Sequence, residues 1–253
     1  MKRNILVFVL FSLISVASAF AVVDVSQLTK ANAAYGAEKY EDAVSQYEDI
    51  LKSGSESSAV YYNLGNSYYK LGKIAPAILN YERALLLNPN DEDVQYNLDM
   101  AKAKTVDKIE GVDRFFLLRF VENVESLFSS NGWAIVSIVC FILMLVLAGL
   151  FVFSRMVTLK KVSFFAGLFV LLLCVVSMYF SGNEKDRITL HEYAVIFAPS
   201  VTVKSSPDES GKDIFLLHEG TKVKVKGDFG KWIEIQLEDG TTGWVQKTSA
   251  ERI

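Results

Sequence analysis

The chain has 253 residues, of which 51% are hydrophobic, and a formal net charge of -3 at pH 7. A chain of this length can hold one or two domains. A net negative charge without a basic stripe argues against nucleic-acid binding, and two cysteines are too few for a disulfide framework. Much of the hydrophobic content is concentrated in three blocks.

The first apolar block predicts an export signal. Lys2 and Arg3 precede an apolar run from Ile5 to Val16, and a small-x-small cleavage pattern follows at residues 17–19. We therefore predict that residues 1–19 are a signal peptide and not part of the fold. The topology predicted below is the same whether this segment is cleaved or retained.

The other two blocks predict a pair of transmembrane helices. Residues 133–154 and 162–181 contain no charged residue. At about 1.5 Å per residue each can cross a hydrocarbon layer of roughly 30 Å. The alternative is a pair of buried core helices, which would show a polar stripe. Cys140 and Cys174 lie one in each block; we interpret them as small packing residues, with a redox pair as the alternative.

The short segment between these blocks predicts the orientation. Residues 155–161 contain Arg155, Lys160 and Lys161 without any acidic residue, whereas the flank after the second block is neutral. Positively charged loops stay in the cytoplasm. We therefore predict a cytoplasmic loop, with both large polar regions on the periplasmic side.

Residues 24–104 predict a helical repeat. A step of 34 residues places Ala43 over Ala77, Tyr47 over Tyr81, and the letters YNL at 62–64 over YNL at 96–98. A period of 34 is typical of stacked helix-turn-helix units. The third copy is a single helix, residues 91–104, which we interpret as a polar cap that ends the stack.

The middle copy resembles the tetratricopeptide repeat (TPR) family. Gly65 and Ala77 are small where the two helices of a unit are expected to cross, and Pro89 ends the second helix. The residues that match the family pattern of large and small positions are Leu64, Gly65, Tyr68, Ala77, Tyr81, Ala84 and Pro89.

This resemblance implies a concave groove lined by the first helix of each unit. Asparagine amides can pair with an extended peptide backbone, and tyrosines add flat contact area. The alternative is that these are solvated surface residues. In some TPR proteins, lysine and arginine grip a C-terminal carboxylate, but Leu28, Asp93 and Asn97 hold those places here, which favours an internal segment or a folded partner. The candidate peptide-binding residues are Asn32, Tyr35, Tyr62, Asn63, Asn66, Tyr69, Tyr96 and Asn97.

Residues 105–130 connect the repeat to the first apolar block. Leu117, Val121 and Val124 recur at helical spacing opposite Arg119 and Glu122. This pattern predicts an amphipathic juxtamembrane helix. The same segment could be the last helix of the repeat stack.

Residues 190–253 change to strand periodicity. Val223 and Val225 alternate with lysines, and Ile233 and Ile235 alternate with polar residues, as in half-buried antiparallel strands. The ordered segments VTVKSSP, LLHEGTKVKV, KWIEIQLEDG and TGWV resemble a bacterial SH3-like domain. That resemblance implies an all-β barrel whose aromatic residues contact peptide or cell-wall glycopeptide. The candidate ligand contacts are Trp232 and Trp244; the alternative is that both pack at the edge of the barrel.

We predict no catalytic residues, no cofactor and no metal site. His191 and His218 are isolated in the sequence, and no nucleophile, base and orienting residue occur together.

The predicted fold is therefore multidomain: an all-α TPR helical repeat, a two-helix transmembrane hairpin and an all-β C-terminal SH3-like barrel. This order resembles the BatE-like proteins of the Bacteroides aerotolerance (Bat) operon. The resemblance implies an inner-membrane complex with Bat proteins that carry von Willebrand A-type domains, linked to a MoxR-type ATPase and to tolerance of oxygen or envelope stress. The alternatives are a peptidoglycan-binding anchor and an enzyme that uses Cys140 and Cys174 as a thiol relay.

Overall fold

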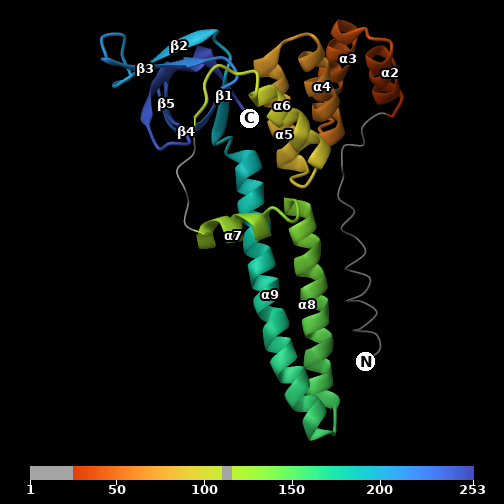
Figure 1. The fold of residues 1–253 in the computed structure, drawn as a ribbon. Coiled ribbons are helices and arrows are strands. Elements are labelled where there is room, and N and C mark those ends of the chain that lie inside the picture. Colours follow the sequence, from red (N-terminus) through yellow and green to blue (C-terminus); the bar gives the residue numbers. More distant parts are fainter. Residues whose placement is uncertain (1–24, 110–115) are drawn as a thin grey trace.

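The computed structural model describes residues 25–109 and 116–253 (Figure 1). The predicted signal peptide at 1–19 lies outside these residues. A polar head, formed by a helical repeat and a β-sheet, stands at one end of a long two-helix stem. The repeat contains α2 (Val25–Gly36), α3 (Tyr40–Lys52), α4 (Ser58–Lys70), α5 (Ile74–Leu87) and α6 (Glu92–Lys102).

Local sequence signals begin and end these helices. The Ser57 and Asp91 side chains each accept a hydrogen bond of 3.2 Å from the backbone N–H three residues later, which caps α4 and α6. Pro89 follows α5 shortly after its last residue, Leu87. The equivalent helices α3 and α5 begin 34 residues apart, at Tyr40 and Ile74. The structure therefore has two complete helix pairs and a single final helix.

Small residues set the distance between the two helices of the second pair. A Cβ atom added at Gly65 would lie 2.8 Å from the ring of Tyr81 and 3.3 Å from the carbonyl oxygen of Ala77. Tyr81 is itself buried in the core of the repeat. The predicted need for a small residue at this crossing is confirmed.

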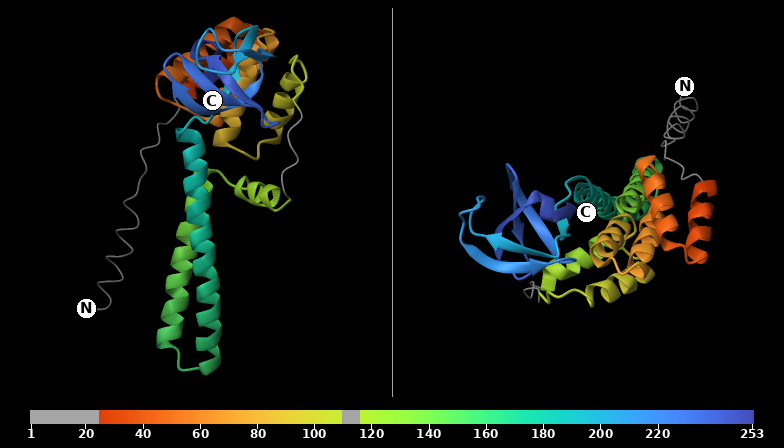
Figure 2. Two further views of the ribbon diagram at one scale, coloured as in Figure 1. Left: turned by 90° about the vertical axis from the view of Figure 1, so that its left-hand side faces the viewer. Right: turned by 90° about the horizontal axis from the view of Figure 1, so that it is seen from above.

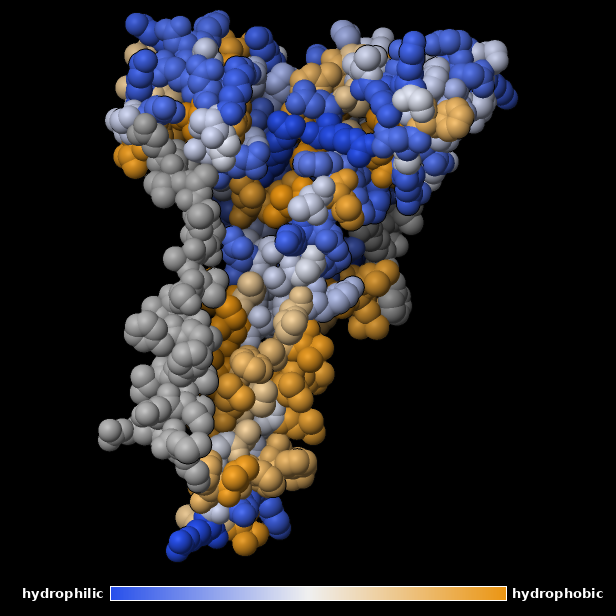
Figure 3. Space-filling view, turned by 180° about the vertical axis from the view of Figure 1, so that it is seen from behind, coloured by the Kyte–Doolittle hydropathy of each residue, from blue (hydrophilic) through white to orange (hydrophobic). Residues whose placement is uncertain are grey.

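The stem contains two helices that are long and apolar enough to cross a membrane, α8 (Ser130–Phe153) and α9 (Val157–Thr189). The short helix α7 (Phe116–Glu125) precedes them and lies across the stem (Figures 1 and 2). Ser130 and Ser181 join the two long helices near the head, because each hydroxyl donates to the carbonyl oxygen of the other residue, at 2.9 and 3.0 Å. Figure 3 shows a hydrophobic stem between a hydrophilic head and a hydrophilic tip.

The second stem helix is longer than the sequence predicted. It begins at Val157, inside the segment predicted as a loop, and continues eight residues beyond the predicted end at 181. Charged residues end a membrane-spanning segment but do not end a helix. The buried Glu184 and the exposed Arg187 form an ion pair of 2.7 Å at i,i+3 spacing. As a result, α9 extends out of the apolar stem and reaches the head.

The C-terminal region is an antiparallel sheet of seven strands in the order β3-β2-β6-β5-β4-β1-β7. Alternate residues such as Val223, Ile233 and Ile235 point into its core, as the strand periodicity predicted. The strands are β1 (Tyr193–Ile196), β2 (Ser200–Lys204), β3 (Asp213–His218), β4 (Lys222–Phe229), β5 (Trp232–Gln236), β6 (Thr242–Gln246) and β7 (Ala250–Arg252).

The sheet and the repeat share a core. Val195 of β1 and the C-terminal Ile253 are buried in the same apolar cluster as Ile78 and Tyr81 of α5. Seen from above, the sheet lies on one side of α5 and the first helix pair on the other (Figure 2). The two modules therefore form one head.

Candidate functional site

The candidate groove residues come together on the first helices of the repeat, α2, α4 and α6. The asparagines form a ladder that connects successive units. Asn63 Nδ2 donates to Asn32 Oδ1 at 3.2 Å, and Asn97 Nδ2 donates to Asn66 Oδ1 at 2.9 Å. Asn97 also donates to the hydroxyl of Tyr62 at 3.0 Å. Each of these bonds joins one first helix to the next, so the amides align the three helices.

Buried tyrosines on the second helices complete this ladder. The hydroxyl of Tyr47 donates to Asn32 Oδ1 at 2.6 Å, and that of Tyr81 donates to Asn66 Oδ1 at 2.8 Å. Neither tyrosine was predicted as a partner of the asparagines, although the 34-residue alignment that pairs the two tyrosines was the available signal. Burial raises the pKa of Tyr47 to about 12 and also raises that of Tyr81, so both remain donors at physiological pH.

The internal bonds determine which polar groups remain for a ligand. Both internal acceptors, Asn32 Oδ1 and Asn66 Oδ1, already receive two hydrogen bonds. In the part of the chain that the structure describes, no hydrogen bond reaches the amide oxygens of Asn63 and Asn97. These two oxygens can accept backbone N–H groups from an extended segment.

The aromatic candidates differ in exposure. Tyr96 of α6 is 66% exposed, and Met100 lies one turn further along the same helix with 42% exposed. Tyr69 is half-buried under the ammonium group of Lys104, which lies 4.1 Å from the ring centroid. Tyr35 packs edge-to-face against Tyr40 at 5.4 Å. The most exposed of the candidate aromatic residues therefore lies on α6.

The two candidate tryptophans point away from the core of the sheet. Their strand neighbours Ile233 and Val245 are buried, so Trp232 and Trp244 lie on the opposite face, where both are half-buried. Phe229, which the sequence analysis did not select, is 61% exposed and packs edge-to-face with Trp244 at 6.4 Å. Phe229 pairs with Trp232 across β4 and β5, so the three rings lie near one another on the outward face.

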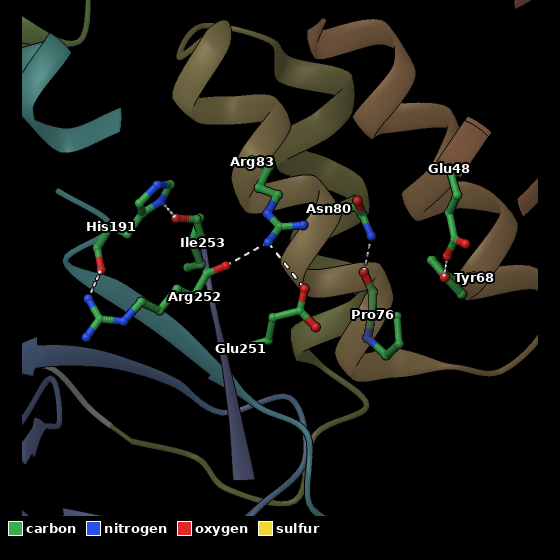
Figure 4. Close-up of polar contacts among 9 residues, drawn as sticks. All are labelled: Glu48, Tyr68, Pro76, Asn80, Arg83, His191, Glu251, Arg252 and Ile253. Atoms are coloured by element: carbon green, nitrogen blue, oxygen red, sulfur yellow. Dashed lines mark hydrogen bonds and ion pairs between the residues drawn. The ribbon is translucent and has the colours of Figure 1, made fainter. Parts of the chain in front are cut away.

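The junction between repeat and sheet involves residues far apart in the sequence (Figure 4). The guanidinium group of Arg83 on α5 donates to the carbonyl oxygen of Arg252 at 2.7 Å and lies 3.3 Å from the carboxylate of Glu251. On the sheet side, His191 Nδ1 lies 2.6 Å from the carbonyl oxygen of Ile253. These contacts fix the last strand against the second helix of the repeat unit.

Two carboxylates strengthen this junction. Glu82 of α5 is buried between the ammonium groups of Lys102 and Lys222, at 2.8 and 2.6 Å. Burial alone would raise the pKa of Glu82, but the two lysines outweigh it and the net shift lowers this pKa. The lysine on β4 is thus joined to the repeat by a buried charge, although the strand pattern predicted a solvent-facing position.

Asp107, in the segment after α6, makes the second carboxylate contact. It accepts hydrogen bonds from the backbone N–H of His218 at 2.7 Å and from the hydroxyl of Thr221 at 2.6 Å, and it lies 2.8 Å from His218 Nδ1. Burial would raise the pKa of Asp107, but these hydrogen bonds outweigh it and lower the pKa. His218 therefore lies in a junction contact, whereas the His191 contact lies within the C-terminal module.

The described residues contain no group of three or more His, Cys, Asp or Glu side chains arranged to hold a metal ion. Cys140 and Cys174 are both free thiols in the stem, and the thiol of Cys174 lies 3.4 Å from the carbonyl oxygen of Ser137.

Comparison with known proteins identifies two modules in the chain. Residues 58–91, which form α4 and α5, match the tetratricopeptide repeat family, and residues 199–250 match the bacterial SH3 domain family. The chain is thus a multi-module protein that combines a TPR-type helical repeat with a bacterial SH3-type sheet. TPR units are associated with protein–protein interaction, and bacterial SH3 domains with cell-wall binding.

Curated relatives share only a small segment with this chain. Sperm-associated antigen 1 of Rattus norvegicus and of Mus musculus are each 35% identical to it over 63 residues, which is 25% of this chain. The chain spans 7% of the length of these relatives.

Proposed function

We propose that this protein is a non-enzymatic adaptor, anchored in a bacterial inner membrane, that binds a protein partner in the groove of its helical repeat. One observation carries the proposal: one side of the repeat is covered by the sheet and the other side is exposed. The sheet occupies the side formed by α5, whereas the first helices present the ladder amides together with the exposed Tyr96 and Met100.

The chemistry of the groove favours an uncharged, extended segment as the ligand. The amide oxygens of Asn63 and Asn97 match backbone donors, while the exposed ring of Tyr96 and the thioether of Met100 match apolar side chains. The three positions at which other TPR proteins carry the basic residues for a C-terminal carboxylate hold Leu28, Asp93 and Asn97 here.

The order of modules supports a place in a Bat-type complex that is linked to aerotolerance or envelope stress. In this proposal the partners are other Bat membrane proteins with von Willebrand A-type domains, and a MoxR-type ATPase acts through them. The head lies on the periplasmic side, since Arg155, Lys160 and Lys161 cluster at the far tip of the stem. Protease added to intact spheroplasts should then digest the head; a head that is cut only after lysis would refute this orientation.

The binding test is co-purification from membranes with groove and control variants. Tyr96→Ser removes the most exposed groove aromatic without breaking a ladder bond, and we expect it to weaken recovery of a von Willebrand A-type partner about tenfold, as for loss of a single aromatic contact of roughly 1–2 kcal/mol. Asp49→Ala, on the exposed surface of α3, is the matched control and should leave recovery unchanged. Equal recovery of the partner with Tyr96→Ser and with Asp49→Ala would rule out the groove as the binding surface.

A cell-wall anchor is the second candidate function, supported by the bacterial SH3 match and the outward aromatic group of Phe229, Trp232 and Trp244. In that case purified peptidoglycan should sediment the full chain, and Phe229→Ala should abolish the sedimentation while Tyr96→Ser leaves it intact. If instead Tyr96→Ser weakens recovery of the protein partner in the co-purification and Phe229→Ala does not, the adaptor function is favoured.

A further inference from the structure

The short helix α7 exposes an unusually apolar face. Phe116, Leu117, Phe120 and Val121 are between 45% and 68% exposed. These four residues follow one another at steps of one, three and one and lie on one face of the helix, away from Glu122. Leu118, which is 57% exposed, lies on the other side, next to Glu122. A contiguous apolar surface of this kind marks a site that contacts another apolar phase or molecule.

The position of this face is fixed relative to the stem. The indole N–H of Trp133, near the start of α8, donates to the carbonyl oxygen of Glu125 at 2.7 Å, and the amide of Asn183 on α9 donates to the Glu125 carboxylate. Phe128 and Phe180 pack against the Trp133 ring at 5.1 and 5.0 Å. The end of α7 is therefore held where the apolar stem meets the polar head.

The direction of α7 suits a membrane surface. It runs across the stem and not along it (Figures 1 and 2). The charge-free stretches of the stem end at Glu125 and Glu184, which marks the boundary between hydrocarbon and head groups. Because α7 lies level with this boundary, its exposed face continues the apolar surface of α8 and α9, which Figure 3 shows as a hydrophobic band below the head.

We propose that α7 lies in the interfacial layer of the leaflet next to the head, with Leu117, Phe120 and Val121 inserted among the acyl chains. The inference depends on the proposed membrane anchoring by α8 and α9. Of the charged side chains in α7, Arg119 and Glu122 are exposed and of opposite sign, while Glu125 is held by the stem. Insertion is accordingly driven by apolar burial and does not require anionic lipid.

Such an insertion defines how the head is held. Asn90, just after α5, donates to the carbonyl oxygen of Leu127 at 2.6 Å and connects the repeat to the turn after α7. With α7 fixed in the interface and α8 and α9 fixed in the bilayer, this contact restricts rotation of the repeat about the stem. The groove would thus face partners at a constant height above the membrane.

The test measures depth in the bilayer with an environment-sensitive fluorophore on single cysteines in the full chain. The background is Cys140→Ser/Cys174→Ser, and the protein is reconstituted in phosphatidylcholine vesicles that contain lipids with spin labels on their acyl chains. The labelled positions are Phe120→Cys on the apolar face of α7, Glu122→Cys on its opposite face, and Val139→Cys, which is 59% exposed in the middle of α8.

We expect the labels at 120 and 139 to be quenched several-fold more than the label at 122, and the result to be the same when phosphatidylglycerol is added. Quenching at 139 without quenching at 120 would overturn the proposal for α7 and leave the membrane anchor intact. Absence of quenching at 139 would overturn both. Equal quenching at 120 and 122 would contradict the one-sided insertion, as would a requirement for the anionic lipid.

Discussion

The two sides of the helical repeat use polar residues in different ways. On the groove side, neutral amides and phenols form the ladder from Asn32 to Asn97. On the sheet side, charged groups such as Glu82, Asp107 and Arg83 are held between the modules. A neutral network can align helices and still present hydrogen-bonding groups to a ligand, whereas a buried ion pair tolerates no loss of either partner, because the remaining charge would be uncompensated. The comparison indicates a permanent junction on one side and a surface open to exchange on the other.

The largest expected effect comes from breaking the buried charge cluster at the junction. Glu82→Ala leaves Lys102 and Lys222 next to each other without their carboxylate and should destabilise the head by about 3 kcal/mol, near the lower end of the cost of breaking a buried ion pair because both lysines are partly exposed. Thermal unfolding in detergent, followed by tryptophan fluorescence, measures the change.

The matched control for this variant is Glu251→Ala, which removes the partly exposed ion pair with Arg83 at the same junction. It should cost less than about 1 kcal/mol. If the two variants unfold at the same temperature, the junction does not depend on the buried carboxylate.

A smaller effect is expected from filling the contact between the sheet and the repeat. Gly220→Ala would place a Cβ atom 2.7 Å from the Thr105 side chain and 3.1 Å from that of Ile78. Gly240→Ala is its control, because both glycines have positive φ, +86° and +89°, but nothing lies within 4 Å of the added atom at 240. Both variants carry the same backbone strain, so Gly220→Ala should cost about 1–3 kcal/mol more. Equal losses would mean that this contact can open without cost.

Acid should weaken the junction before the ladder. The folded-state pKa values of Glu82 and Asp107 are lowered below their ordinary values of 4.5 and 3.8, so both carboxylates contribute stability above these values, and this stability is lost as the pH falls through the lowered values. We expect limited proteolysis of the segment that follows α6 and carries Asp107 to increase below about pH 4. Glu82→Gln, which is uncharged throughout, should weaken this dependence and leave the part due to Asp107, and an unchanged profile would contradict the assignment.

The smallest effect is expected within the ladder. Tyr81→Phe removes the buried hydroxyl that donates to Asn66 and should cost about 1 kcal/mol, because the amide oxygen keeps its second donor, Asn97. Tyr96→Phe changes an exposed ring and should leave the unfolding temperature unaltered. A loss for Tyr96→Phe as large as for Tyr81→Phe would show that exposure does not separate structural from binding tyrosines.

Much of the fold follows from local sequence patterns. The helical repeat, the close helix crossing and the strands were predicted, because each depends on the immediate surroundings of a residue. Their signals were the 34-residue step, the small residue at Gly65 and the alternation around Ile233 and Ile235. The junction could not be predicted, because its contacts join residues that are 111 to 169 positions apart, as in Asp107 to His218 and Arg83 to Arg252. A lysine on a strand, such as Lys222, has the same local pattern whether it faces water or a buried carboxylate.

The candidate site shows the same limit. The alignment of Tyr47 with Tyr81 identified equivalent positions, but only the three-dimensional arrangement shows that each hydroxyl holds an asparagine of the first helix. Sequence reasoning treated all eight groove residues alike. The structure separates the internal acceptors Asn32 and Asn66 from Tyr96, which faces outward.

Site-specific photo-crosslinking in intact cells tests the central claim most directly. A photoreactive amino acid replaces Tyr96 in the groove or Asp49 on the outer face of α3, in otherwise identical full-length chains. We predict a discrete crosslinked product with a partner protein at position 96 and none at position 49. Crosslinks of equal yield at both positions, or at 49 alone, would contradict the assignment of the groove as the binding surface.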